Sequence, residues 1–124
     1  MTLPEAQRRW RTARQIDLQA QLGPLRRGSG DPTWHGELGG AIWRNTLTPD
    51  GPGLERLAVD RTAGEVWLQA WGRGAAWLAD RLPVLLGDAD DPMGFDPPEV
   101  LVSTVKRYPG WRVGRTDRVL EALV

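Results

Sequence analysis

An arginine pair on a glycine-flanked loop is the feature of this sequence best suited to bind an anion. Arg26 and Arg27 stand directly before Gly28-Ser29-Gly30. Guanidinium groups donate paired hydrogen bonds to phosphate oxygens, so a loop that presents two of them is a candidate phosphate-binding segment. A solvated surface turn contains the same residue types, and from these residues alone that plainer interpretation is favoured.

Other residues with catalytic or metal-binding chemistry are sparse. His35 is the single histidine and there is no cysteine, which leaves no zinc site, no disulfide and no cysteine nucleophile. Neither Ser29 nor Ser103 stands in a nucleophile-elbow sequence. The acidic residues of Asp88–Asp91 lack the spacing and closing glutamate of a calcium loop. We therefore predict no catalytic residue, no metal site and no cofactor.

The composition indicates a globular protein without an overall field for nucleic acid. Sixteen basic residues balance sixteen acidic ones, so any binding of nucleic acid has to be local. A hydrophobic content of 40% that includes seven tryptophans is sufficient for a core. No apolar run approaches the roughly 20 residues of a membrane span, and no signal peptide follows the N-terminal arginines. The sequence thus predicts a soluble cytoplasmic protein without a membrane partner.

Alternating residues and turn signals predict the strands. The alternation of apolar and polar residues over 15–22 predicts a first strand, which ends at Gly23-Pro24. The glycine-rich segment 34–40 is expected to be irregular. Further strands are expected over 41–48, 54–60 and 65–71, the last two forming a hairpin across 61–64.

Helical spacing replaces this alternation in the second half of the chain. A helix is predicted over 73–86, kinked or broken at Pro83. A second helix is expected over 97–107, with Val100, Leu101 and Val105 buried. Thr116 is typical of an N-cap for a third helix over 117–124, whose apolar residues Leu120, Leu123 and Val124 need a partner to pack on.

The connector Tyr108–Gly114 between the last two helices invites comparison with a helix-hairpin-helix turn, whose backbone N–H groups bind a DNA phosphate. That hairpin has its second glycine two residues after the first, whereas Gly110 and Gly114 are four apart. A plain interhelical connector is therefore the better interpretation.

Several short motifs follow one another in an order that resembles a known family. They include Leu22–Gly28 (LGPLRRG), Thr48–Pro52 (TPDGP), Tyr108–Gly110 and Gly114–Val124. Their order is similar to that of the N-terminal portion of the DNA-3-methyladenine glycosylase II family, the alkylation-repair branch of the helix-hairpin-helix glycosylases. The resemblance covers nearly the whole chain from about Ile16 onward.

The resemblance implies an α+β fold: an antiparallel sheet of about four to five strands backed by helices, similar to a TATA-binding-protein repeat, followed by the first helices of an incomplete helical domain. The expected divisions are a basic N-terminal arm over 1–14, either frayed or touching DNA, the α+β domain over 15–87, and a linker with the first helices over 88–124. The family's hairpin and catalytic aspartate lie downstream of Thr116, so neither is placed here and this chain alone is expected to be inactive.

The resemblance also implies partners and site residues. Pro24 and Leu25 correspond to the loop at the edge of the family's substrate cleft, while Arg26 and Arg27 are placed to reach phosphate beside it. Double-stranded DNA is the expected partner of the full-length protein, and the catalytic domain or a second copy is expected on the C-terminal helix. The alternatives are a simple domain-packing loop and, for the whole chain, a stand-alone binding or scaffold module.

Overall fold

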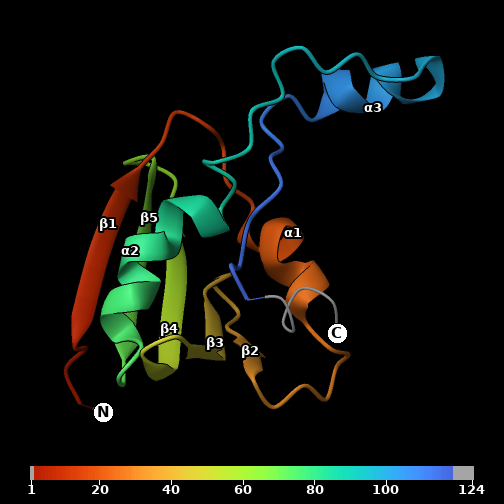
Figure 1. Cartoon of the computed structure of the whole chain (residues 1–124). Coiled ribbons are helices and arrows are strands. Elements are labelled where there is room, and N and C mark those ends of the chain that lie inside the picture. Colours follow the sequence, from red (N-terminus) through yellow and green to blue (C-terminus); the bar gives the residue numbers. More distant parts are fainter. Residues whose placement is uncertain (1, 119–124) are drawn as a thin grey trace.

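The structure is a five-stranded antiparallel sheet with two helices on one face (Figure 1). This computed structural model describes residues 2–118. The strand order is β1-β5-β4-β3-β2. The strands are β1 (Ala6–Arg11), β2 (Trp34–Gly36), β3 (Ile42–Thr48), β4 (Gly51–Asp60) and β5 (Glu65–Trp71). The α-helices are α1 (Leu18–Leu22), α2 (Ala75–Leu85) and α3 (Val102–Arg107), with 3-10 turns η1 (Gly23–Leu25) and η2 (Glu99–Leu101).

The predicted α+β class is confirmed. The strand predicted over 65–71 matches β5, and those over 41–48 and 54–60 match β3 and β4 with shifted starts. The expected hairpin is also present, since β4 and β5 pair in register up to Asp60 and Glu65. The likeness to a TATA-binding-protein repeat stays a prediction.

The first predicted strand is wrong, because this segment forms helix α1. Asp17 Oδ1 accepts a hydrogen bond from Ala20 N at 3.1 Å and caps the start of the helix. Leu18 and Leu22 stand four residues apart, so one helical face buries both. A strand would bury every second residue and a helix roughly every fourth, and over so short a segment both patterns select these two leucines.

The predicted basic arm is also wrong in part. Residues Ala6–Arg11 form the edge strand β1, which pairs with β5 from Ala6–Ala70 to Arg11–Glu65. Exposed Arg9 and Arg11 alternate with half-buried Arg8 and Trp10, so the arginines that resemble a tail occupy a half-buried strand. The opposite edge, β2, falls in the glycine-rich segment expected to be irregular. The α+β unit therefore begins near residue 6.

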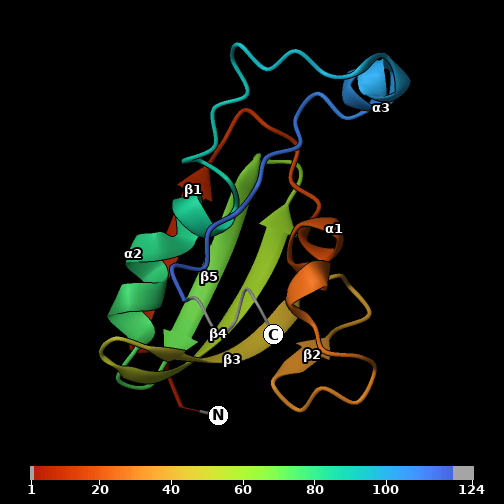
Figure 2. The ribbon, with the colours of Figure 1, turned by 45° about the vertical axis from the view of Figure 1, so that its right-hand side comes forward.

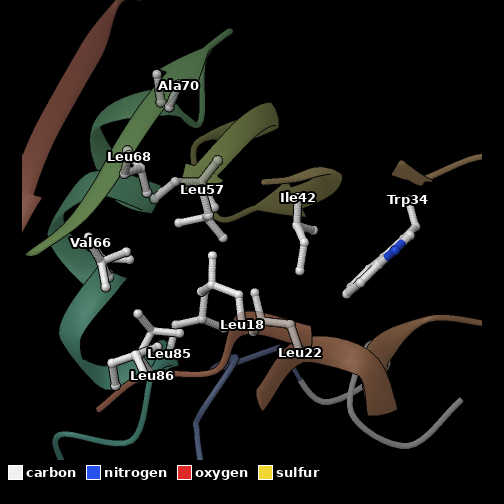
Figure 3. Packing of buried hydrophobic residues seen from close by; sticks show 14 residues of the cluster. Leu18, Leu22, Trp34, Ile42, Leu57, Val66, Leu68, Ala70, Leu85 and Leu86 are labelled. Atoms are coloured by element: carbon white, nitrogen blue, oxygen red, sulfur yellow. The ribbon is translucent and has the colours of Figure 1, made fainter. Parts of the chain in front are cut away.

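The core lies between the sheet and the helices α1 and α2, which cover the same face (Figures 1 and 2). In Figure 3, Leu18 and Leu22 of α1 point toward Leu57 and Ile42 of the sheet. Trp34 closes one end of this layer, at 8% exposure. Each fully buried aliphatic side chain of this kind stabilises the fold by about 1.5–3 kcal/mol. The packing fixes α1, and with it the loop that follows.

Helix α2 is continuous through Pro83 to Leu85, so the predicted break does not occur. It begins after Gly74, where the chain passes very close to the β3–β4 turn. A Cβ atom at Gly74 would lie 2.6 Å from Thr48 Oγ1 and 2.8 Å from Gly51 O. Only a residue without a side chain fits at this position.

Residues 88–111 form an excursion that projects away from the sheet and contains η2 and α3 (Figures 1 and 2). The helix predicted over 97–107 is thus present from Glu99 onward. Its expected burial is wrong, since Val100 is 83%, Leu101 45% and Val105 41% exposed. The excursion carries these side chains beyond the reach of the core.

The chain then returns and passes between α1 and α2 (Figure 2). Arg115 N donates to Val84 O of α2 at 3.0 Å. On the other side, Gln21 Nε2 of α1 donates to Arg112 O at 3.0 Å. Part of the segment assigned to a second domain therefore packs on the first.

The third predicted helix falls largely outside the described residues. Thr116 Oγ1 accepts a hydrogen bond from Arg118 N at 3.1 Å, as the side chain of an N-cap would. Asp117, however, has a φ of 55° and is not helical. The rest of the prediction, including Leu120, Leu123 and Val124, concerns residues that the structure does not describe.

Candidate functional site

The loop that carries the arginine pair is organised by Asp31. Its Oδ2 accepts a hydrogen bond from Arg27 N at 2.9 Å, and its Oδ1 accepts from Thr33 N at 2.9 Å and Thr33 Oγ1 at 2.6 Å. These hydrogen bonds lower the pKa of Asp31 to about 2, and the bond from the Thr33 hydroxyl has the largest effect. The loop therefore contains one fixed carboxylate beside its two guanidinium groups.

The four predicted site residues lie in η1 and the turn that follows it. Pro24, Arg26 and Arg27 are exposed, whereas Leu25 is half-buried against the core. Arg26 Nη2 donates to Ser29 O at 3.2 Å, which folds this guanidinium back onto its own turn. The pair is thus accessible, but part of its hydrogen-bonding capacity is used within the loop.

A groove with a volume of about 510 Å³ lies between this loop and strand β3. Leu25 and Arg27 line it on one side, and Asn45 and Leu47 of β3 line it on the other. Trp34 also contributes to the lining, whereas Pro24 and Arg26 do not. The structure thus brings two of the four predicted residues together at one groove. Its lining combines apolar side chains, arginines and one carboxylate, that of Asp117, which pairs with Arg81. Such a lining suits a ligand with both a flat apolar part and an anionic group.

A buried ion pair lies beneath this groove. Arg44 Nη1 of β3 is 2.6 Å from Glu55 Oε1 of β4, at 4% and 0% exposure of the side chains. Burial raises the pKa of Glu55, and the contact with Arg44 opposes that effect. Glu55 Oε2 and Arg81 Nε are buried and have no hydrogen-bond partner in residues 2–118. Both residues border a space of about 10 Å³, which has room for one water molecule.

The sheet face opposite the helices carries aromatic and paired charged residues. Trp43 and Trp71 stack there, with ring centroids 5.4 Å apart. Arg56 Nε lies 2.8 Å from Glu37 Oε2. Because a nearby carboxylate balances this arginine, the pair adds no excess charge to the face that would favour a polyanion.

No family model, curated protein or solved structure matches this chain. The site is therefore interpreted from its own residues. No helix within residues 2–118 has the length and apolar character needed to cross a bilayer. In the same part of the chain, no group of three histidine, cysteine, aspartate or glutamate side chains is arranged to hold a metal ion.

Sequence reasoning missed the buried ion pair. In strand β3, Trp43, Asn45 and Leu47 share the more exposed face. The same period of two places Arg44 on the buried face, where a charge requires a partner. The alternation along the strand therefore predicts a buried arginine at position 44, but only the pairing of Arg44 with Glu55 between β3 and β4 identifies its partner.

Proposed function

We propose that this chain is the non-catalytic N-terminal part of a cytoplasmic DNA glycosylase that removes alkylated purines. In this role the chain shapes one edge of the substrate cleft and packs on a helical catalytic domain. The order of motifs from Leu22 to Gly114 leads to the proposal, and the five-stranded α+β architecture belongs to the class that the family resemblance implies.

The observation that carries the proposal is the apolar surface of the excursion. Of the large hydrophobic residues that are exposed within 2–118, most lie between residues 93 and 113: Met93, Phe95, Val100, Leu101, Val105, Tyr108, Trp111 and Val113. A contiguous segment with so many exposed apolar side chains is typical of a surface that another structural unit covers. The helices of a catalytic domain would provide that cover.

The groove beside the arginine loop supports the second part of the proposal. Leu25 and Leu47 offer apolar surface there, and Arg27 adds a cation at its edge. An alkylated purine is a flat and partly apolar group attached to a phosphodiester backbone, so the groove combines the chemistry needed at the edge of such a cleft. The residue that cleaves the glycosidic bond is not assigned to this chain.

Release of alkylated purines from methylated duplex DNA tests the proposal. The assay compares this chain with the product of the complete reading frame from which the chain is translated. We expect release by the complete product and none by the 124-residue chain alone. A complete product without base release, or a reading frame that stops at Val124, would contradict the glycosylase role and favour a stand-alone binding module.

A further inference from the structure

A second groove, about 670 Å³ in volume, lies between the start of α1, the β4–β5 turn and the segment after α3. Its charged lining residues are Arg14, Arg61, Arg107, Arg112 and Asp17. Four positive charges against one negative charge leave +3 on this lining, in a chain whose formal net charge is zero. We call it the arginine groove.

Two of the four arginines of the groove are not neutralised within the described part of the chain, although Asp88 and Asp90 attract a third, Arg14. Arg61 and Arg107 are exposed, and neither forms an ion pair with another residue of the described part of the chain. The carboxylate of Asp17 is engaged in capping α1, through its hydrogen bond from Ala20 N. The charges of Arg61 and Arg107 are therefore available to an external anion.

Two of the arginines in this groove, Arg14 and Arg112, lie close enough to repel each other. Arg14 Nη2 donates to Leu86 O at 3.1 Å, while its buried Nη1 has no hydrogen-bond partner within residues 2–118. Burial lowers the pKa of Arg14, and repulsion from Arg112 lowers it further, against attraction from Asp88 and Asp90. An anion bound beside Arg14 and Arg112 would relieve this repulsion.

Two exposed aromatic rings share the arginine groove. Tyr108 is 55% and Trp111 50% exposed, and both line the groove together with the arginines. Proteins that bind single-stranded nucleic acids combine aromatic rings, on which bases stack, with basic side chains that follow the backbone. An acidic peptide would satisfy the arginines but would leave the rings exposed, and a duplex keeps its bases stacked inside.

We propose that the arginine groove binds a single-stranded polynucleotide. Arg61 and Arg107 contact phosphates, and Trp111 and Tyr108 stack on bases. This inference rests on a different groove from the one lined by Leu25, and it concerns the 124-residue chain on its own, because Tyr108 and Trp111 also belong to the apolar surface that a catalytic domain would cover. DNA and RNA share the chemistry involved, so the experiment has an arm for each.

Fluorescence anisotropy of labelled oligothymidylate and oligouridylate, each about 10 nucleotides long, tests the proposal over a series of salt concentrations. The wild-type chain is expected to bind at low salt. The variant Arg61→Gln/Arg107→Gln changes two exposed side chains. It is expected to reduce the slope of the logarithm of the observed binding constant against the logarithm of the salt concentration by about 1.4, because each lost phosphate contact reduces that slope by about 0.7. The matched control Arg9→Gln/Arg73→Gln, which changes two exposed arginines outside both grooves, is expected to leave that slope unchanged.

Stacking is tested separately at Trp111. Trp111→Leu is expected to weaken binding about 5- to 150-fold, and Trp111→Phe to retain most of it. No binding at low salt, or a slope unchanged in Arg61→Gln/Arg107→Gln, would overturn the proposal. Equal binding of polyglutamate or of a duplex, with no effect of Trp111→Leu, would also overturn it. Stronger binding of one oligonucleotide identifies DNA or RNA as the ligand, and neither result depends on base release.

Discussion

Arg8 Nη1 donates a 2.8 Å hydrogen bond to the carbonyl oxygen of Ala79, which joins strand β1 to helix α2. The bond has a specific cause. Pro83, four residues after Ala79, lacks the N–H that would bond this carbonyl in a regular helix. The guanidinium of Arg8 supplies a donor instead, so the edge strand and the proline inside α2 are coupled.

Arg8→Met is therefore expected to destabilise the fold by about 1–3 kcal/mol, the cost of leaving a partly buried carbonyl without a donor. In a Pro83→Ala background the same substitution should cost less, because the alanine restores the helical N–H. Urea denaturation of the two single variants and the double variant measures this coupling. Equal costs in both backgrounds would refute it, and Arg11→Met, on the exposed face of β1, is the control.

The buried pair of Arg44 and Glu55 predicts a stronger effect. Arg44→Met leaves Glu55 as an unpaired buried carboxylate and should cost about 3–5 kcal/mol in the free energy of unfolding. Arg44→Met/Glu55→Leu should recover much of that loss, because no charge remains buried. The measurement is chemical denaturation. A double variant as unstable as Arg44→Met would show that the loss of stability comes from losing the ion pair itself and not from leaving the Glu55 carboxylate buried without a partner.

Titration of Asp31 reports on the arginine loop. Its pKa of about 2 lies below the ordinary value, so its hydrogen bonds stabilise the loop above about pH 4 and are lost as the pH falls toward 2. NMR of the Asp31 carboxyl carbon should give this pKa, and the amide of Arg27 should titrate with it. Thr33→Val, which removes the hydroxyl donor, should raise the pKa toward 3.8. An unshifted pKa in the wild-type chain would contradict the loop geometry.

The close approach at Gly74 predicts a steric effect. Gly74→Ala should destabilise the fold by about 1–3 kcal/mol, because its Cβ would contact both Thr48 and the backbone of Gly51. Gly39→Ala is the matched control, since a Cβ there has no heavy atom within 4 Å. Thermal unfolding of the two variants compares them. Equal stabilities would indicate that the start of α2 can shift away from the β3–β4 turn.

The central strands could be predicted from sequence because their pattern and their environment agree. In β5, Val66, Leu68 and Ala70 face the core while Trp67 lies on the other face. The local alternation of residues is therefore sufficient to predict the strand and its buried face. Around Leu18, by contrast, helix and strand select the same inward residues, and only the Asp17 cap distinguishes them. For β1, the decisive contact is the pairing with β5, about 60 residues away in the sequence, which no local signal reveals.

The candidate site was predictable only in part. The glycines and the arginine pair identified the loop, but the groove also needs Asn45 and Leu47 from a strand far along the chain. Val100 and Val105 were predicted to be buried but are exposed. A helical apolar pattern indicates that one helix face packs against something, but it does not indicate that the packing partner belongs to the same chain.

Base-release kinetics of the complete product, with and without Arg26→Ala/Arg27→Ala, test the central claim that this loop borders the substrate cleft while the chemistry lies elsewhere. The account predicts a kcat/KM on methylated duplex DNA that is lower by about tenfold, through a higher KM and with kcat retained, as expected for lost phosphate contacts. An unchanged kcat/KM, or a kcat that falls while KM stays constant, would contradict it.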